Sequence, residues 1–428
     1  MMVDAKAVAA AAALSVAWFL AGCVTTPQAP DDVSMKTDLR KPTQPSINAR
    51  VLSDASVLDY SIATSIDPAA ERFTRLESRY TLKLSDAEEH LRIGDTVSTA
   101  GQWGSTVRYG GLQFGTRTTP REDVLYSERL AASGMAVLPT AADALFASIS
   151  DGDSVLSRQS LSLSGAPKFN EQNTVSFVAK DSFGLSEALN VPLVAPTRLV
   201  DSGCSDFALG VGKVREDYAF TSNEYGPVFA NTTVACSAPL GFTIEGHGEY
   251  LANQVAALGL GLARRLGTLG TASVAFASSE TEIGSGWLAR VGFEHRSSLL
   301  NFAVRTRVQS REFREVANVW VEDPIMRRNL ASVGLNVGEG ATIALAYAEQ
   351  TTWERERADI LSLNQKMSFG RGSILVTAGH SFADDVGSSF FLSYKRPFGT
   401  PARRATFDTQ DLELIEVAVG RRQLSEGG

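Results

Sequence analysis

The residues that could do chemistry in this sequence are few and widely separated. Its four histidines stand at His90, His247, His295 and His380, and its three cysteines form no CxxC pair. Metal sites need such ligands at close, regular spacing, as in HExxH, and that motif is absent from the sequence. Gly259-Leu260-Gly261-Leu262 lies in an alternating segment and opens no helix, so it does not predict a dinucleotide-binding loop. We therefore expect no enzyme activity, no metal and no cofactor.

Composition limits the class of protein. The 428 residues include 40 Lys and Arg against 48 Asp and Glu, a net charge of -8, which argues against a nucleic-acid binder. Hydrophobic residues make up 44% and charged residues 21%, so the chain as a whole is not disordered. A mean hydropathy of -0.03 is too low for a bundle of membrane helices but compatible with a membrane β-barrel, whose strands alternate apolar and polar residues.

The N-terminus predicts export. Residues 1–23 combine Lys6 with a short apolar stretch that ends in Leu20-Ala21-Gly22-Cys23. This ending resembles a bacterial lipobox, in which Cys23 is acylated; a plain secretory signal peptide with a coincidental cysteine is the alternative. Residues 24–49 are rich in Pro, Asp, Thr and Lys and predict a disordered linker.

Export also bears on the two remaining cysteines. An oxidising compartment allows Cys204 and Cys236 to form a disulfide. Two cysteines placed in this way are more often unpaired or incidental, so the sequence leaves both states open.

A period of two dominates from about residue 50 onward. In Leu300 to Gln309, and again in Phe242 to Tyr250, apolar side chains alternate with polar ones. Such segments are about 9–11 residues long, which is the length that a tilted strand needs to cross a bilayer. Their polar faces carry Arg, Glu and Gln, as the wall of a water-filled lumen does. The pattern favours an all-β fold, a transmembrane antiparallel β-barrel, over stacked soluble β-sandwiches, which also alternate.

One stretch interrupts the long strands and predicts a small inserted β-sandwich. Its short predicted strands are Asp143 to Ile149, Ser160 to Leu163 and Thr174 to Ala179. The predicted organisation has barrel strands in residues 50–130, the insert in 131–195, the remaining barrel strands in 196–400 and a polar tail in 401–428.

The segment from Leu91 to Thr116 combines a Gly-Asp strand end, a Trp-Gly pair and an Arg-aromatic-Gly-Gly strand. The residues concerned are Gly94, Asp95, Trp103, Gly104, Arg108, Tyr109, Gly110 and Gly111. Further segments follow in order at Ser133 to Phe146, Phe177 to Gly184, Pro196 to Gly203 and Asp206 to Tyr250. Together they resemble the outer-membrane fimbrial ushers of the chaperone–usher pathway, in a truncated and divergent form.

The resemblance implies a barrel with an internal plug, a pore through which pilus subunits are secreted and assembled at the bacterial outer membrane. It implies pilin subunits and a periplasmic chaperone as partners, with outer-membrane lipid around the barrel. It implies no active site, because donor-strand exchange between subunits supplies the energy. We expect the chaperone-recruiting domain of ushers to be missing, because only a polar linker ending at Ala49 stands in its place.

The plug is expected to be residues 131–195, held by polar contacts with the barrel wall. The expected contact residues are Arg108, Glu245, His247, Arg305 and Arg307 on the wall, and Asp143, Lys168 and Asp181 on the plug. Partly solvated ion pairs contribute about 0–1 kcal/mol each, so several must act together. Two other interpretations stay open: a passive or vestigial porin-like outer-membrane barrel, and a soluble β-rich surface lipoprotein that binds a partner.

Overall fold

The computed structural model describes most of the chain between residues 46 and 395. The described residues are 46–52, 56–64, 71, 73–85, 88–117, 119–122, 124, 136–147, 168–170, 174–180, 186–218, 220–337, 341–369, 372–382 and 388–395. The expected signal sequence with Cys23, the plug residue Asp181 and the polar tail lie outside them. Within the described residues, no helix has the length and apolar character needed to cross a membrane.

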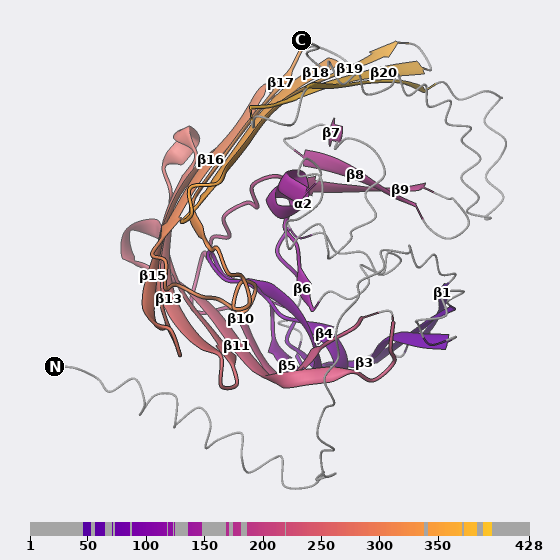
Figure 1. Cartoon of the computed structure of the whole chain (residues 1–428), viewed down its shortest axis with the longest axis vertical. Helices are drawn as coiled ribbons and strands as arrows, with labels where there is room; N and C mark the ends of the chain where they lie inside the picture. The colour runs from indigo at the N-terminus through magenta and orange to yellow at the C-terminus, as the bar shows by residue number, and fades with distance from the viewer. Residues whose placement is uncertain are drawn as a thin grey trace, which may run out of the picture. The chain divides into compact units, whose positions relative to one another are not determined.

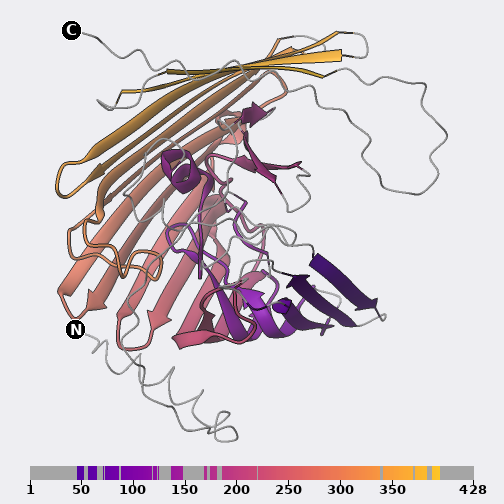
Figure 2. The same ribbon diagram turned by 45° about the vertical axis from the view of Figure 1, so that its right-hand side comes forward.

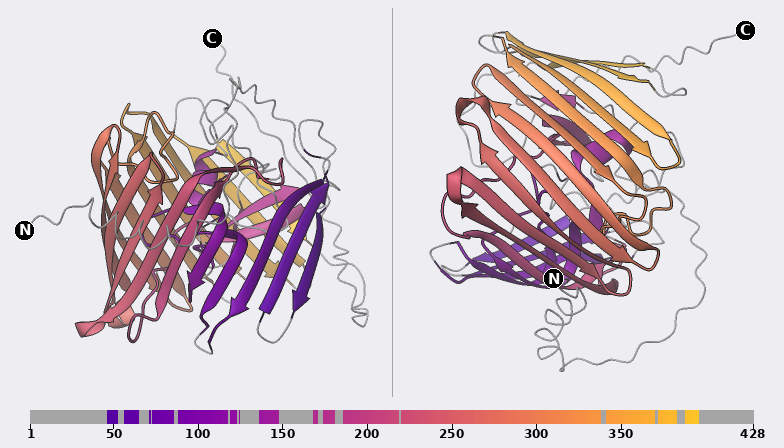
Figure 3. Two further views of the ribbon diagram at one scale, coloured as in Figure 1. Left: turned by 90° about the horizontal axis from the view of Figure 1, so that it is seen from below. Right: turned by 90° about the vertical axis from the view of Figure 1, so that its left-hand side faces the viewer.

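One antiparallel sheet of 18 strands dominates the described residues (Figures 1 and 3). Its first strands are β1 Ser46–Leu52, β2 Ser56–Thr64, β3 Phe73–Lys83, β4 His90–Val97 and β5 Thr106–Gly115. After an insert it continues with β10 Asp206–Arg215, β11 Tyr225–Ala238, β12 Phe242–Leu251, β13 Val255–Arg265, β14 Thr271–Thr281, β15 Gly284–Arg296, β16 Leu300–Gln309, β17 Ile325–Asn336, β18 Ala341–Thr352, β19 Arg357–Phe369, β20 Gly372–Ser381 and β21 Ser388–Lys395. Short 3-10 turns, η1 Pro239–Gly241 and η2 Gly267–Leu269, join two of the hairpins.

Each strand of the sheet pairs with its neighbour in sequence, and β5 pairs with β10 across the insert. Among the described residues, no ladder joins β1 to β21. β1 begins at Ser46, inside the segment expected to be a linker. Residues 46–52 pair in register with β2, and this pairing orders the last residues of the expected linker.

The two faces of the sheet have opposite polarity. On β13 and β14 the large apolar side chains point outward, and Leu258, Leu260 and Phe276 are more than half exposed, at 63%, 65% and 56%. The residues between the outward ones face the interior and are buried, and on neighbouring strands these interior residues include Glu245 and Arg290. A soluble sheet buries its apolar face, so this arrangement is the reverse of a soluble protein and is typical of a membrane barrel.

The insert between β5 and β10 lies on the polar, concave side of the sheet (Figures 1 and 2). Its elements are β6 Val137–Leu138, α2 Ala141–Ala147, β7 Lys168–Asn170, β8 Thr174–Lys180 and β9 Ser186–Pro192. β6 pairs with β5, whereas β7, β8 and β9 form a separate three-stranded sheet. α2 packs against the inner side chains Leu330, Ala348 and Ile360 of β17 to β19.

Helix α2 corrects the strand expected at Asp143 to Ile149, whereas β8 confirms the strand expected at Thr174 to Ala179. Thr140 and Asp143 form a capping box at the start of α2. The Asp143 carboxylate accepts the Thr140 backbone N–H at 2.9 Å, and the Asp143 N–H donates to the Thr140 hydroxyl at 3.3 Å. These bonds satisfy free donors of the first turn, and the following alanines favour helix, so the alternating pattern here does not produce a strand.

Candidate functional site

The centre of the polar face is a row of three side chains on β12. Alternation turns Glu245, His247 and Glu249 inward, and all three are buried. The His247 ring is fixed on both sides, because Nδ1 lies 2.7 Å from the hydroxyl of Thr233 and Nε2 lies 3.2 Å from Glu249. The row therefore offers two buried carboxylates with an immobilised ring between them.

A loop between β4 and β5, residues 98–105, folds over this row. The backbone N–H of Gln102 donates to Glu245 at 2.5 Å, and the backbone N–H of Ser105 donates to Glu249 at 2.6 Å. Trp103 lies between these two bonds with its ring 4.8 Å from the ring of His247, in an edge-to-face arrangement. Hydrogen bonds to a carboxylate are about twice as strong as neutral ones, so the two glutamates hold the loop in the interior.

Two glycines on β13 make room for the loop. Gly259 and Gly261 face the interior, whereas the leucines between and beside them face outward. A Cβ on Gly259 would lie 2.5 Å from Trp103 Nε1, and one on Gly261 would lie 2.7 Å from the amide of Gln102. The glycine–leucine alternation in this strand is thus explained by close packing inside and apolar exposure outside.

A second loop, residues 310–324 between β16 and β17, covers the first. Phe313 is fully buried, and its ring lies 6.3 Å from that of Trp103. The backbone N–H of Val316 donates to the second oxygen of Glu249 at 3.2 Å. Glu249 therefore ties both inward loops to the same point on the wall.

Glu315 in the second loop is a buried carboxyl group. Burial raises the pKa of Glu315, and the nearby Glu249 adds to the rise while the guanidinium of Arg307 opposes it. Arg307 donates to Glu315 at 2.7 Å. This ion pair fastens the loop to β16.

Arg117 fixes the point at which the chain leaves β5 for the insert. It donates to Asp206 through Nε at 2.8 Å and to Glu245 through Nη1 at 3.0 Å. Burial alone would lower the pKa of Arg117, but the hydrogen bonds and charges of the two carboxylates raise it. Asp206 begins β10, so this bridge joins the two ends of the insert at the wall.

The returning end of the insert is held through its backbone. The Arg305 guanidinium on β16 donates to the carbonyl of Ala195 at 2.6 Å. The backbone N–H of Val200 donates to the hydroxyl of Thr243 on β12 at 2.9 Å. Both bonds come from residues on the polar face, so the connection follows the inner wall.

An ion pair anchors helix α2 to β17. Asp143 lies 2.7 Å from Arg328, whose guanidinium lies 5.6 Å from the centre of the Phe146 ring. Burial would raise the pKa of Asp143, but the charge of Arg328 and the bonds from Thr140 outweigh it and lower the pKa. The Asp143 carboxylate is therefore charged at neutral pH.

Within the described residues, several wall residues have partners other than those expected. Glu245 and His247 face the interior as expected, and the contacts that the structure describes for them are with the 98–105 loop and Arg117. Arg307 pairs with Glu315. Alternation sets the face of each residue correctly, whereas the partner depends on which loop folds inward, and that is not a local property of a strand.

The expected plug residues are only partly described. Asp143 contacts the wall as expected, but its partner is Arg328, which the sequence pattern did not single out. The side chain of Lys168 and the whole of Asp181 lie outside the described residues. The guanidinium of Arg108 lies 3.9 Å from the ring of Tyr218 in the β10–β11 loop, and its expected contact with the plug stays a prediction.

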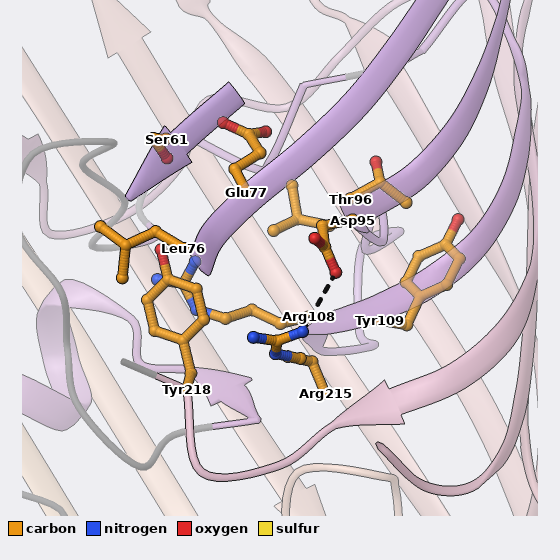
Figure 4. Close-up of a pocket in the computed structure, with 10 residues that line it drawn as sticks. Ser61, Leu76, Glu77, Asp95, Thr96, Arg108, Tyr109, Arg215 and Tyr218 are labelled. Carbon is orange, nitrogen blue, oxygen red and sulfur yellow. Dashed lines mark hydrogen bonds and ion pairs between the residues drawn. The ribbon is translucent and has the colours of Figure 1, made fainter. Parts of the chain in front are cut away.

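Asp95, a motif residue of β4, lies in a polar cluster with residues of neighbouring strands (Figure 4). The cluster is close to the end of β4 from which the 98–105 loop begins. Asp95 accepts the Tyr225 hydroxyl at 2.6 Å and the Ser78 backbone N–H at 3.0 Å. It lies 3.1 Å from the guanidinium of Arg75 and 3.5 Å from that of Arg215. Asp95 is the common acceptor that joins β3, β10 and β11.

The motif glycines permit this cluster. Gly94 has φ +110, and a Cβ there would lie 2.1 Å from the carbonyl oxygen of Ser78. A Cβ on Gly110 would lie 2.4 Å from the Tyr225 ring. Burial raises the pKa of Tyr218, which covers the cluster from the adjoining loop. In this structure the motif positions 94, 95 and 110 therefore serve strand packing.

The structure joins Cys204, just before β10, to Cys236 on β11 by a disulfide. In the part of the chain that the structure describes, no group of three or more His, Cys, Asp or Glu side chains is placed to hold a metal ion.

No protein-family model matches the sequence, and no curated protein matches it. Among solved structures, the P pilus usher (PapC) translocation pore is similar, with a TM-score of 0.54 and 15% identity over 83% of this chain and 77% of that chain. The chain has the fold of an usher translocation pore. The E. coli P pilus tip assembly intermediate PapC-PapD-PapK-PapG is similar with a TM-score of 0.52 and 17% identity, over 83% of this chain and 48% of that chain.

The usher fold agrees with the fold class expected from alternation and from the motif run. The observations that sequence patterns missed are the inward loops and their anchors, above all Glu249, Phe313 and Arg328. The one signal that pointed to them is the inward pair of glycines on β13, because small residues on a polar wall indicate a close neighbour.

Proposed function

We propose that this protein is a usher-like pore of the bacterial outer membrane that passes and assembles pilus subunits delivered by a periplasmic chaperone. The observation that carries the proposal is the reversed polarity of the sheet, combined with an interior occupied by segments held through polar bonds. An apolar exterior suits lipid, and a polar interior suits the passage of folded, hydrated cargo.

The geometry supports a closed resting state that cargo can open. The 98–105 loop and the insert are bound to the wall mainly by backbone hydrogen bonds and ion pairs, which water or a cargo surface can replace. A pilin strand needs no catalysis to be exchanged, because main-chain pairing with the next subunit drives the step. The proposal therefore includes no catalytic residue, metal or cofactor.

A passive porin-like barrel is the second candidate. The interior charged residues Arg290, Arg305 and Glu245 are equally compatible with a passive porin. A charged pore wall also suits the passage of small hydrated solutes. The two functions differ in what touches the wall: pilin subunits must contact inward residues during secretion, whereas small solutes leave no adduct.

Photo-crosslinking at two adjacent residues of β16 tests the proposal. Arg305 faces the interior and Val304 faces outward, at 9% and 44% exposure. A photoreactive residue placed at position 305 should form adducts with pilin in cells that are assembling pili, and one at position 304 should not. Adducts at neither position, in a strain that makes surface fibres through this protein's gene cluster, would leave the passive pore as the better account.

A further inference from the structure

The outward face of β17 to β19 carries a charged cluster near one end of these strands. The orientation is fixed by the neighbours: Leu330, Ala348 and Ile360 pack against α2 on the inside, so Asn329, Glu349 and Asp359 must face outward. These three outward residues stand directly opposite one another on adjacent strands. Arg327 and Arg357 occupy the next outward row, on either side of Thr351.

The cluster is tightly connected. Glu349 accepts Arg327 at 2.9 Å and Asn329 at 2.7 Å, and lies 3.6 Å from Arg357. Arg357 also donates to Asp359 at 2.9 Å. The side chains of Glu349 and Asp359 are only 10% and 7% exposed. Those of Arg327 and Arg357 are 45% and 58% exposed, so the guanidiniums cover the carboxylates on the outer surface of the sheet.

The free-energy cost of placing an arginine in lipid sets the depth of this cluster in a bilayer. An arginine on the lipid-facing side costs about 2–4 kcal/mol at the midplane but only about 0–1 kcal/mol near the interface. The preceding outward row, Ala331, Tyr347 and Leu361, is apolar with one tyrosine, the residue type enriched at membrane interfaces. The cluster therefore lies just beyond the apolar band, at the level of the lipid headgroups.

We propose that Arg327 and Arg357 form a binding site for the phosphate of a membrane lipid headgroup. The guanidinium fork matches phosphate oxygens in pairs, and the buried carboxylates hold both forks in place while leaving their outer edges accessible. The acyl chains of such a lipid would lie along the apolar outer residues Leu345 and Leu363 of the same strands. The inference rests on the proposed membrane location but not on pilus secretion.

Native mass spectrometry of protein extracted from membranes into mild detergent tests the site. The wild type should retain about one phosphate-bearing lipid per chain, and the Arg327→Gln, Arg357→Gln double variant should retain at least tenfold less. Arg296→Gln is the matched control. Arg296 is an exposed arginine (60%) that also pairs with a glutamate, Glu294, but it lies at the opposite end of the strands from Arg327. Arg296→Gln should retain lipid as the wild type does. Equal lipid retention by the double variant and the wild type would overturn the proposal.

Adding phosphate-bearing compounds one at a time to the delipidated protein identifies which of them the site binds. A phosphorylated lipid A-type glycolipid and phosphatidylglycerol are added to delipidated protein, each against inorganic phosphate at the same concentration. Either lipid should raise the melting temperature of the wild type and not that of the double variant. If inorganic phosphate gives the same rise, the site binds free anions and the lipid proposal fails.

A further variant covers the case in which the double variant does not fold. Arg357→Lys keeps the charge but loses the fork, so it should retain less lipid than the wild type while migrating on gels as a folded barrel. Full retention by Arg357→Lys would contradict the proposal. Recovery of the wild type only in soluble fractions would instead contradict the membrane location, and thus the proposed function itself.

Discussion

Trp103 is buried against His247 and Phe313 by a loop that has no regular structure of its own, and its place depends on Gly259. Protein interiors are close-packed, so an added methyl group at a filled position forces its neighbours to move. A Cβ at Gly259 would lie 2.5 Å from the Trp103 ring and 2.6 Å from the Cβ of Ala277. It would also lie 2.6 Å from the carbonyl oxygen of Phe276, so both the loop and the pairing of β13 with β14 must shift.

Gly259→Ala should therefore loosen the 98–105 loop and open the pore. Overpacking of this kind costs about 1–3 kcal/mol, enough to populate a state in which the loop has left the interior. Single-channel conductance in planar bilayers should rise relative to the wild type. Gly246→Ala is the control, because Gly246 lies on the neighbouring β12 and the nearest atom to its added Cβ is 3.9 Å away. Equal conductance in all three proteins would show that the loop does not restrict the pore.

The direction of each strand residue could be predicted from sequence, but its partner could not. Glu245 faces the interior because β12 alternates, and this follows from the order of its residues alone. Its bond to the backbone of Gln102 joins residues 143 positions apart, and nothing in either segment specifies the other. The same limit applies to Arg328 and Asp143, which belong to different elements that meet only in the folded chain.

At the scale of elements, α2 shows how capping and packing can stabilise a short helix. Seven residues are too few for a helix to be stable alone, so its capping box and its packing against β17 to β19 must supply the stability. The ion pair of Asp143 with Arg328 is part of that packing. Because the pKa of Asp143 is lowered on folding, its contribution is present at neutral pH and is lost as the pH falls through the folded-state pKa.

Breaking this pair should release the insert from the wall. We expect Arg328→Gln to weaken docking of α2 by about 1 kcal/mol, which is about a fivefold rise in the open fraction. Trypsin should then cleave within the insert about fivefold faster at limiting protease concentration. Asp143→Asn should give a similar effect, and the two together should not add.

The control for this experiment is the adjacent residue. Arg327 has the same charge but faces outward to Glu349, so Arg327→Gln should leave the rate of cleavage within the insert unchanged. If Arg327→Gln and Arg328→Gln accelerate cleavage equally, the ion pair to α2 is not what holds the insert.

At the scale of the whole molecule, the sheet is stabilised by opposite environments on its two faces. Outward leucines such as Leu258 and Leu260 stay exposed, while glutamates and arginines fill the interior. In water this arrangement would leave a large apolar surface exposed, which soluble monomers rarely do. In lipid the same surface is stabilised, and the closely bonded interior replaces water around its charged groups.

This difference gives a prediction that separates a membrane barrel from a soluble lipoprotein. Leu260 lies in the middle of β13, with its side chain 65% exposed on the outward face. Leu260→Arg should destabilise the protein folded in lipid vesicles by about 2–4 kcal/mol, because the charge would lie near the bilayer midplane. Leu269, in turn η2 after β13, is equally exposed at 69% but lies beyond the strand, so Leu269→Arg should cost only about 0–1 kcal/mol. Urea titrations in vesicles, followed by heat-modifiable migration on gels, measure both values. In a soluble protein an arginine at either exposed position would change stability little, so two small and equal values would exclude the membrane barrel.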